Sequence, residues 1–336
     1  MKRSFFLLCA VLLVLGSLLP LAGYRLALAV LGPNAPAPAA SSAESTPPES
    51  ITEVPPSDQD SETFLLADQS TGAVVSVSRR EYLIGAVAAE MPITWPEEAL
   101  KAQAIAAHSY LLYCRDHAQD PAAGWLRVDP ARRQGYLNDA VLRSYWGTAY
   151  EENYARLSAL VDSVLTQVLY YDNAPAGTSY FAISNGQTEA SENVWGSAVP
   201  YLVPVDSSTD LAADNYTYTI QFSAAQVQEL LAGLGLSPDA SAPEGWFGPS
   251  TLTASGYVAS LPVCGQTVTG PALRKALGLR SACFTVQYQN GTFFFTTKGY
   301  GHGVGMSQWG ARALAEQGQT ATEILAHYFP GTELRS

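Results

Sequence analysis

The residues around Pro92 restrict the fold of this 336-residue chain more than any other feature. Proline disfavours helical geometry in the residue before it, so a helix that precedes it ends at about Glu90. Ser78–Glu81 has the S-x-x-E form of a capping box, which marks where that helix begins. A second capping box, Thr94–Glu97, opens a longer helix. The sequence therefore predicts two consecutive helices joined by a short turn at Pro92.

Glu90 falls at the C-terminal end of the first predicted helix, on its apolar face. Leu83, Ala86 and Val87 recur at helical spacing and share that face with Glu90. Burial and the negative end of the helix dipole both disfavour an ionised carboxylate, so we expect a raised pKa. A raised pKa suits a carboxylic acid that donates a proton in catalysis. The alternative is a helix-end glutamate whose side chain reaches water or pairs with a basic neighbour.

The second predicted helix carries polar residues on an otherwise small and apolar face. Lys101 and His108 lie on that face, and we expect them either to support Glu90 or to reach the surface at the edge of a core. Cys114 and His117 are three residues apart and could ligate a metal. No companion Cys or His lies nearby, which favours a structural role for both.

The N-terminal segment, residues 1–31, differs in composition from the rest. A basic start, Met1–Arg3, precedes an uncharged run from Phe5 to Gly23 that is long enough to span a bilayer. We expect a single uncleaved transmembrane anchor with a cytoplasmic tip. A cleaved signal peptide is the alternative, because Ala27–Ala29 has the small-x-small form of a cleavage site.

Residues 32–62 are rich in proline, alanine, serine and acidic side chains, which is typical of an extended linker. The folded domain is then residues 63–336, held outside the cytoplasm at the cell membrane. The net charge of −12 argues against nucleic acid as a partner. The three cysteines of this domain are too few and odd in number for a disulfide framework, although a Cys264–Cys283 pair stays open.

The middle of the chain predicts strands and a polar loop. "VLYYD" and "SYFAIS" are apolar or alternating runs separated by turn residues. The polar loop that follows, 184–189, is either a simple turn or a set of ligand contacts. Its candidate ligand-binding side chains are Ser184, Asn185 and Thr188. A further helix is expected at Ala224–Leu231, with Gly233 just beyond its end.

The C-terminal part predicts a hairpin, a glycine-rich segment and two helices. "CFTVQY" and "TFFFTT" flank Gln289–Gly291, a strong hairpin signal. Glycines at 299, 301, 303 and 305 follow, and helices begin at about Ser307 and after a capping box at Thr320–Glu323. A strand, a glycine loop and a helix N-terminus together can hold a ligand. The side chains that we expect there are Tyr300, His302, Ser307 and Gln308. The fold class predicted from all these elements is α+β, in one lobe or in two lobes around a cleft.

Four stretches, taken together and in this order, resemble the stage II sporulation protein D family, also called the SpoIID/LytB domain. They are "EYLIGAVAAEMPITWPEEALKAQAIAAHSY", "SNGQTEASENVWGSAVPYL", "ALRKALGLRSACFTV" and "KGYGHGVGMSQWGARALAEQGQTATEILAHYFPGT". The resemblance covers residues 64–334. It implies a membrane-anchored lytic transglycosylase that acts on peptidoglycan, with the glutamate of the "EMP" motif, Glu90, as catalytic acid and base.

The resemblance implies further details of site and partners. Lys101 matches the family's lysine, whereas His108 stands where the family usually has arginine, which differs in charge and geometry. Some members bind zinc after this helix pair, but residues 118–145 contain neither His nor Cys, so no metal and no cofactor is expected. Implied partners are peptide-stripped glycan strands, the amidase stage II sporulation protein P and the membrane protein stage II sporulation protein M. The implied setting is engulfment during endospore formation.

Two other functions compete with this one. The first is a non-catalytic module that binds glycan and enhances a cell-wall amidase, which needs the binding site but not Glu90. The second is a metal-dependent hydrolase that uses His302, His108 and Cys114, although their spacing does not match a known ligand pattern. If Glu90 were not the catalytic acid, Glu189 and Glu192 would be the carboxylates to consider.

Overall fold

The computed structural model describes residues 62–336, and their fold is mixed α+β, as the sequence predicts. The predicted anchor and nearly all of the predicted linker lie outside these residues. Among the helices that the structure does describe, none is both long and apolar enough to cross a membrane. The described residues belong to one compact unit of the chain and bury two separate hydrophobic cores.

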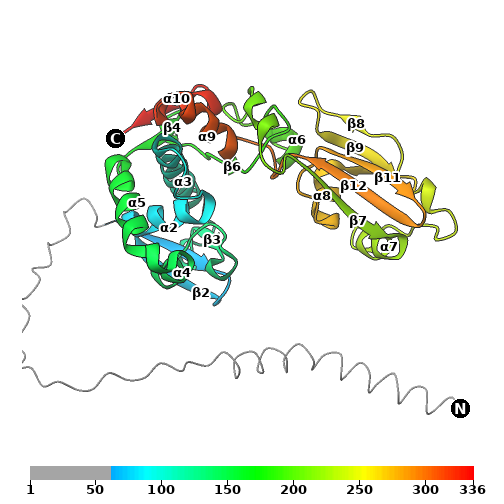
Figure 1. The fold of residues 1–336 in the computed structure, drawn as a ribbon, viewed down its shortest axis with the longest axis horizontal. Helices are drawn as coiled ribbons and strands as arrows, with labels where there is room; N and C mark the ends of the chain where they lie inside the picture. Colours follow the sequence, from blue (N-terminus) through cyan, green and yellow to red (C-terminus); the bar gives the residue numbers. More distant parts are fainter. Residues whose placement is uncertain (1–61) are drawn as a thin grey trace, which may run out of the picture. The chain divides into compact units, whose positions relative to one another are not determined.

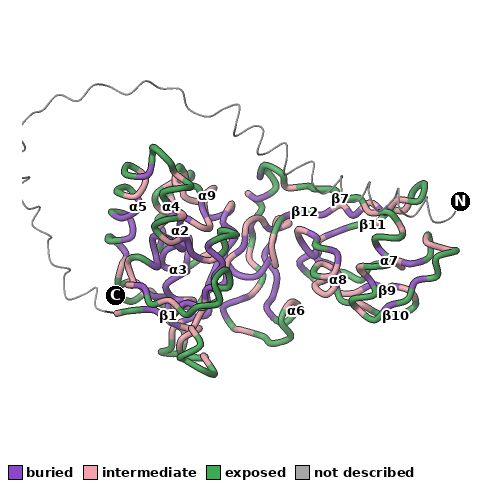
Figure 2. The backbone as a smooth tube through the Cα atoms, turned by 90° about the horizontal axis from the view of Figure 1, so that it is seen from below, coloured by how far each residue is buried: buried purple, intermediate pink, exposed green. Residues whose placement is uncertain are grey.

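Helix α3 (Glu97–Asp116) forms the centre of the first core. It packs against α2 (Arg79–Glu90) and α5 (Tyr150–Val164), and also against the C-terminal helices α9 (Gln308–Glu316) and α10 (Ala321–Tyr328). The C-terminal helices, red in Figure 1, thus return to the helix pair that starts the domain. The backbone of α2 and α3 is mostly buried, because small alanines let neighbouring helices approach closely (Figure 2).

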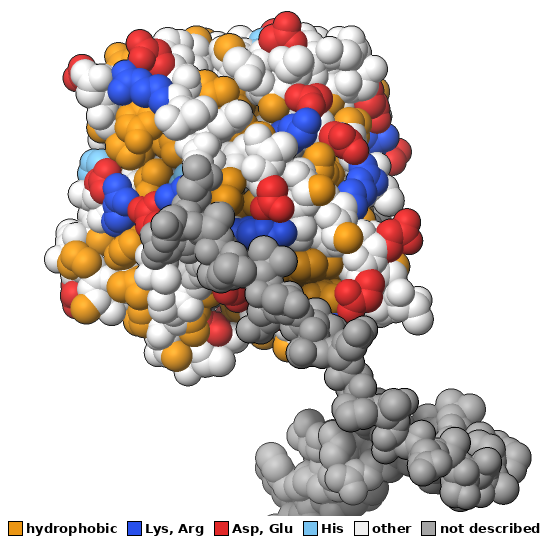
Figure 3. Space-filling view, turned by 90° about the vertical axis from the view of Figure 1, so that its left-hand side faces the viewer, with side chains coloured by type: hydrophobic (Ala, Val, Ile, Leu, Met, Phe, Trp, Pro, Cys, Tyr) orange, Lys and Arg blue, Asp and Glu red, His pale blue; other side chains and the backbone are white. Residues whose placement is uncertain are grey.

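Short sheets complete the first core. β1 (Thr63–Asp68) pairs antiparallel with β2 (Ala73–Ser78) and parallel with β3 (Leu126–Val128). β4 (Val168–Tyr171) lies between β14 (Glu333–Arg335) and β5 (Ala174–Pro175), and β6 (Tyr180–Phe181) pairs parallel with β13 (Met306–Ser307). Short helices of this half include α4 (Asp139–Trp146), α6 (Ser191–Trp195) and the 3-10 helix η5 (Ser208–Ala212). On the face drawn in Figure 3, basic and acidic side chains are interspersed.

The second core lies between two three-stranded sheets and two helices. One sheet has the order β11 (Phe284–Gln289), β12 (Thr292–Lys298), β7 (Thr217–Ser223). The other has the order β10 (Gln266–Thr269), β9 (Val258–Val263), β8 (Thr251–Leu252). Helices α7 (Ala224–Ala232) and α8 (Gly270–Leu277) pack against β7 and β9, respectively (Figure 1).

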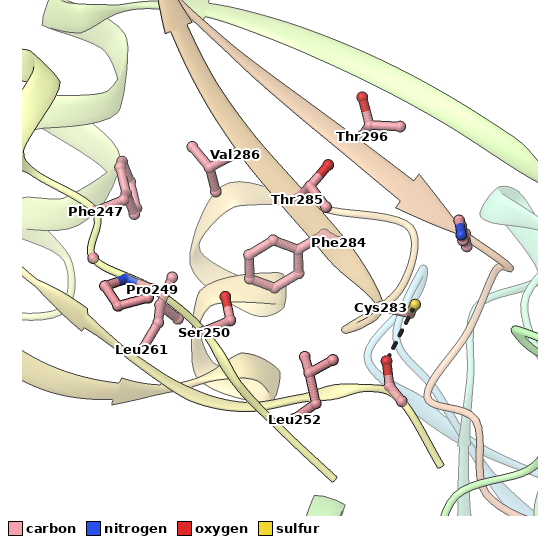
Figure 4. Close-up of a pocket in the computed structure, with 13 residues that line it drawn as sticks. Phe247, Pro249, Ser250, Leu252, Leu261, Cys283, Phe284, Thr285, Val286 and Thr296 are labelled. Carbon is pink, nitrogen blue, oxygen red and sulfur yellow. Dashed lines mark hydrogen bonds between the residues drawn. The ribbon is translucent and has the colours of Figure 1, made fainter. Parts of the chain in front are cut away.

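The predicted hairpin is confirmed. The turn residues Asn290 and Gly291 both have positive φ, 49° and 81°, which is the conformation of a two-residue hairpin turn whose twist matches its strands. A pocket of about 490 Å³ opens beside the β11 edge of this sheet, lined by Phe247, Leu252, Phe284 and other mostly apolar side chains (Figure 4). Glu90 is not among the residues that line it.

Some local predictions were wrong. Thr94 does not cap α3. The Trp95 amide donates to the Pro92 carbonyl and so extends the turn past Thr94, and Pro96 occupies the N-cap position of the helix. Ser78 does cap α2, but its box is only half formed. The carboxylate of Glu81 accepts a hydrogen bond from the Tyr136 hydroxyl instead, at 2.9 Å.

Two strand predictions also differ from the structure. The run "SYFAIS" forms only a two-residue strand, β6, because its partner β13 is equally short before α9 begins. Strand β1, before the predicted strand at Ala73–Val77, was not expected. It forms a hairpin with the adjacent strand β2 along its whole length, and its last three residues also pair with β3.

Candidate functional site

Glu90 ends α2, as predicted. Met91 has an extended backbone (φ −128°, ψ 140°) because the next residue is Pro92, so the helix stops and the Glu90 carboxylate lies at its C-terminus. The side chain is partly buried. Burial raises the pKa of the Glu90 carboxyl, and hydrogen bonds from the Gln308 side chain and the Gly135 backbone offset only part of that rise. Glu90 therefore retains its proton to a higher pH than an exposed glutamate does.

Gln308 is the residue that the structure brings to Glu90 from the other end of the domain. It is the first residue of α9, and its Nε2 donates a hydrogen bond of 3.0 Å to Glu90 Oε2. The same amide lies 3.4 Å from Oε1 of Gln103, a fully buried residue of α3. Gln103 was not predicted as a site residue, although a glutamine in an alanine-rich buried helix is a signal for one. Gln308 therefore links the side chain of Glu90 on α2 to Gln103 on α3.

Ser307 holds the start of α9 in place. Its Oγ accepts the Gly310 amide as the N-cap of the helix and donates to Asp210 Oδ2 at 2.7 Å. Asp210, in η5, is fully buried, and the same oxygen also accepts the Ser184 amide at 2.6 Å and the Ser207 hydroxyl at 3.2 Å. Burial raises the pKa of Asp210, and these hydrogen bonds lower it in part. Asp210 was missed by sequence reasoning, and its hydrogen bond with Ser307 ties it to the start of α9.

The charge of Glu90 acts on the pKa values of two tyrosines. Burial first, and the negative charge of Glu90 second, raise the pKa of the Tyr180 hydroxyl far above its ordinary range. Burial likewise raises the pKa of Tyr82, with a smaller contribution from Glu90. Both hydroxyls therefore stay protonated at any physiological pH. Tyr180 lies in β6 beside Met306, so the same short strand pair positions Tyr180 and the start of α9.

His302 makes no hydrogen bond to Glu90 in the described structure. Its ring packs against Phe181 and Trp195, with ring centroids 5.5 and 5.3 Å apart. Its Nδ1 accepts the Val304 amide at 3.1 Å. Burial, and next the positive charge of Arg274, lower the pKa of His302 to about 4, so the ring is neutral at physiological pH.

The polar groups of the loop after β6 mostly form hydrogen bonds within the protein. Ser184 gives its amide to Asp210, as described above. Thr188 Oγ1 donates to the Val203 carbonyl and accepts the Val205 amide. Asn185 Nδ2 donates to the Ser255 carbonyl at 2.8 Å, which ties this loop to the second core. These three predicted site residues are thus engaged in hydrogen bonds within the protein.

Lys101 and His108 do not meet Glu90 in the described structure. Lys101 forms an ion pair with Glu98, one turn earlier in α3, at 2.8 Å. His108 is buried, its Nδ1 lies 3.1 Å from the Gln167 carbonyl, and its Nε2 has no partner among the described residues. Burial lowers the pKa of His108 to about 4. The face of α3 that reaches Gln308 carries Gln103, and Lys101 and His108 lie on another face.

The glycines before α9 are explained by close contact within the protein. Gly305 has φ 82°, and a Cβ at this position would collide with the carbonyl oxygen of Ser179. Gly299 has φ 77°, and its Cβ would lie 2.6 Å from the Ile183 carbonyl oxygen. The segment therefore packs tightly along β6, which leaves Tyr300 on the surface, 49% exposed.

The remaining candidates are the possible metal ligands, two cysteines and two alternative carboxylates. Within residues 62–336, no three His, Cys, Asp or Glu side chains are grouped closely enough to hold a metal ion. Cys264 and Cys283 are free thiols. Glu189 is buried and accepts hydrogen bonds from Ala190, Asn193 and Thr253, so both of its oxygens are engaged. Glu192 is exposed.

Comparisons with known proteins identify the family of this chain. Residues 67–171, which include Glu90 and Gln103, match the family model of the stage II sporulation protein. The chain is 39% identical to stage II sporulation protein D of Bacillus amyloliquefaciens, over 79% of this chain and 76% of that protein. It is 38% identical to the Bacillus subtilis protein of the same name, over 81% and 77%. It is also 27% identical to a Bacillus subtilis amidase enhancer, over 76% of this chain and 40% of that protein. The chain belongs to the stage II sporulation protein D family of sporulation proteins.

Proposed function

We propose that this protein is a lytic transglycosylase that cleaves peptide-stripped peptidoglycan strands between N-acetylmuramic acid and N-acetylglucosamine. The observation that carries the proposal is the state of Glu90, a partly buried carboxyl with a raised pKa that is held by the Gln308 amide. A carboxyl of this kind is protonated when it meets the glycosidic oxygen and can act as a general acid. The chain's membership of the stage II sporulation protein D family supports peptidoglycan as the substrate class.

In the proposed reaction Glu90 acts twice. It first gives its proton to the glycosidic oxygen, and the bond from C1 of the muramic acid to that oxygen breaks. The carboxylate then takes the proton of the C6 hydroxyl of the same sugar, and that oxygen bonds to C1 to close a 1,6-anhydro ring. Glu90 is protonated again at the end, and no water is consumed. Gln308 stabilises the intermediate carboxylate, because an amide donor favours the ionised form.

Among the described residues, no second carboxylate joins the hydrogen-bond network of Glu90, which favours this reaction over hydrolysis. Glycosidases that use water generally need two carboxyl groups across the bond that is cut. In residues 62–336 no acidic side chain shares the hydrogen-bond network of Glu90, Gln308 and Gln103. Glu98 is paired with Lys101, and Glu189 is fully hydrogen-bonded elsewhere.

To test the chemistry, the full-length chain is incubated with peptide-stripped glycan strands, and the masses of the new strand ends are measured by mass spectrometry. Anhydro-muramyl ends, one water lighter than reducing ends, are the expected product. Reducing muramic acid ends would mean that water attacks C1, and the proposed reaction would be wrong.

The proposal includes place and partners. The uncharged run from Phe5 to Gly23 would anchor the chain, with residues 63–336 outside the cytoplasm, in the space between mother cell and forespore. The amidase stage II sporulation protein P and the membrane protein stage II sporulation protein M would act with it. Detection of a mature form that begins near Val30 and is free of the membrane would contradict the anchor.

A second function is favoured by one comparison. The relative named amidase enhancer suggests a module that binds glycan and stimulates an amidase without cleaving the strand. In that case glycan binding and amidase stimulation would persist in a Glu90→Gln variant, and the wild-type protein would release no anhydro ends.

A further inference from the structure

Asp210 is a buried carboxyl that takes no direct part in the proposed reaction. It is fully buried in η5, and it forms no ion pair among the described residues. One of its oxygens, Oδ1, also has no hydrogen-bond partner within residues 62–336. A buried acidic group that is left partly unsatisfied destabilises the folded state. Native proteins retain such groups where they serve another purpose, and the partners of the second oxygen indicate that purpose here.

The second oxygen of Asp210, Oδ2, holds the first turn of α9. It accepts the Ser307 hydroxyl at 2.7 Å, and the same hydroxyl oxygen accepts the Gly310 amide as the N-cap of the helix. The Ser207 hydroxyl, which also donates to this oxygen, lies 2.8 Å from the hydroxyl of Tyr328 in α10. A Cβ at Gly310 would collide with the Tyr328 hydroxyl and would lie 2.7 Å from Ser207 Oγ. The first turn of α9 is therefore packed directly on this cluster and has little room to shift.

Gln308 follows Ser307 in the chain and makes the contact with Glu90. Its Nε2 donates a hydrogen bond of 3.0 Å to Glu90 Oε2. The reach of this amide depends on where α9 begins, because Gln308 is the first residue of the helix. Hydrogen bonds and one peptide link therefore lead from Asp210 to Glu90 without a gap. Asp210 and Ser307 are both fully buried, so a sugar cannot touch either of them.

The neighbouring helix α10 shows that an N-cap does not need a buried carboxyl. Thr320 caps α10 and Glu323 bonds back to it, which is a complete capping box formed within one turn. The cap of α9, Ser307, is instead bonded to a residue 97 positions away in the chain. A local cap fixes only the start of its own helix, whereas this bond also fixes the start of α9 relative to η5. The bond to Asp210 therefore sets the position of α9 in addition to capping it.

We propose that Asp210 and Ser307 are positioning residues for the proposed reaction. They hold the first turn of α9 where the Gln308 amide reaches the Glu90 carboxylate. This inference rests on the proposed function, in which Glu90 is the catalytic acid, and extends it to two residues that no substrate touches. The Gln308 amide stabilises the carboxylate that Glu90 becomes after it gives up its proton. If the first turn of α9 shifts, that hydrogen bond weakens and the chemical step slows, while binding of the strand is unchanged.

The test removes the Ser307 hydroxyl and changes no charged side chain. In full-length Ser307→Ala, kcat for the release of anhydro-muramyl ends should fall roughly 10-fold or more with KM unchanged, which is the effect of one lost hydrogen bond to a charged group in the transition state. Ser307→Thr, which keeps the hydroxyl, should restore most of kcat. The matched control is Thr320→Ala, which removes the cap of α10 and should leave kcat unchanged. In a Gln308→Leu background, Ser307→Ala should cause no further loss, because the hydrogen bond that Ser307 positions is already absent.

A second measurement needs no substrate. The glutamate carboxyls of the full-length protein are labelled with carbon-13, and the NMR signal of Glu90, identified by its absence in Glu90→Gln, is followed during a pH titration. Ser307→Ala should raise the pKa of Glu90, because a displaced Gln308 amide no longer favours the carboxylate. The titratable side chains whose pKa values the charge of Glu90 affects are Tyr82 and Tyr180, and both stay protonated. Thr320→Ala should leave the titration of Glu90 unchanged.

A Ser307→Ala protein with the kcat and the Glu90 titration of the wild type would overturn the inference. A Thr320→Ala protein with the same losses as Ser307→Ala, or an additional loss in the Gln308→Leu background, would overturn it too. Thermal unfolding is measured for each variant. If Ser307→Ala does not fold, Ser307→Cys takes its place with the same expected directions, because a thiol fills the space but bonds more weakly.

The outcome is separable from the proposed reaction. A raised pKa of Glu90 in Ser307→Ala, together with a wild-type protein that releases no anhydro ends, would refute the reaction alone. A wild-type protein that releases anhydro ends, together with an unchanged kcat and Glu90 titration in Ser307→Ala, would refute the positioning role alone.

Discussion

Replacement of Gln308 by leucine removes the only side-chain donor to Glu90 in the described structure while keeping a side chain of similar length. The lost bond is 3.0 Å long and its acceptor is a partly buried carboxylate, so the loss is worth about 1.5–3 kcal/mol. If the bond holds Glu90 in its reactive position and stabilises the carboxylate, kcat/KM should fall roughly 10- to 150-fold.

The pH profile separates this effect from simple misfolding. A general acid works only when it is protonated, so activity falls as the pH rises through the pKa of Glu90. The Gln308 amide lowers that pKa, and its removal therefore raises the pKa of Glu90 further. The alkaline limb of kcat/KM should move to higher pH in Gln308→Leu. It should stay in place in Gln317→Leu, a change at an exposed glutamine just beyond the other end of α9.

The assay is the release of anhydro-muramyl ends from peptide-stripped strands, measured across pH with both variants. A Gln308→Leu protein with the rate and the alkaline limb of the Gln317→Leu control would refute the assignment of Gln308 to the site. A limb that moved to lower pH would refute the sign of the electrostatic argument.

Two further predictions concern stability. Asp210→Ala leaves the Ser184 amide buried without its acceptor, so it should lower the free energy of unfolding by about 2–4 kcal/mol in denaturant titrations. Asp210→Asn keeps an acceptor and should lower the free energy of unfolding by less. Equal losses in the two variants would contradict the hydrogen-bond network around α9. His108 has a pKa lowered to about 4, so the unfolded chain binds a proton near pH 6.5 that the folded chain binds only near pH 4. Stability should fall as the pH drops from about 6.5 to about 4, with His302 contributing in the same range. His108→Leu should reduce that slope, and an unchanged slope would show that His108 is not buried in its neutral form.

The parts of the fold that were predicted correctly have local causes. Pro92 ends α2, Thr320 caps α10 with a complete capping box, and Asn290–Gly291 forms the hairpin turn, each through contacts within a few residues. Some of the parts that were missed also have local causes. β1 forms a hairpin with the adjacent strand β2, and only its additional pairing with β3 is long-range. The start of α3 is set by the local turn in which the Trp95 amide donates to the Pro92 carbonyl.

The same distinction applies to the site. The sequence predicts Glu90 from its own helix, and its raised pKa follows from burial, as expected. Gln308 was a candidate because of its motif, but its contact with Glu90 spans 218 residues and has no local signal. Spacing placed Lys101 and His108 on one face of the second helix, either to support Glu90 or to reach the surface, yet spacing within one helix does not say which face meets another helix.

The most direct test of the proposed function is the Glu90→Gln variant, assayed for anhydro-muramyl ends with full-length protein and peptide-stripped strands. Glutamine keeps the shape of the side chain but has no proton to donate, so the rate should fall by roughly 10²–10⁴ or more while the fold and glycan binding persist. Release of anhydro ends by Glu90→Gln at near the wild-type rate would contradict the account.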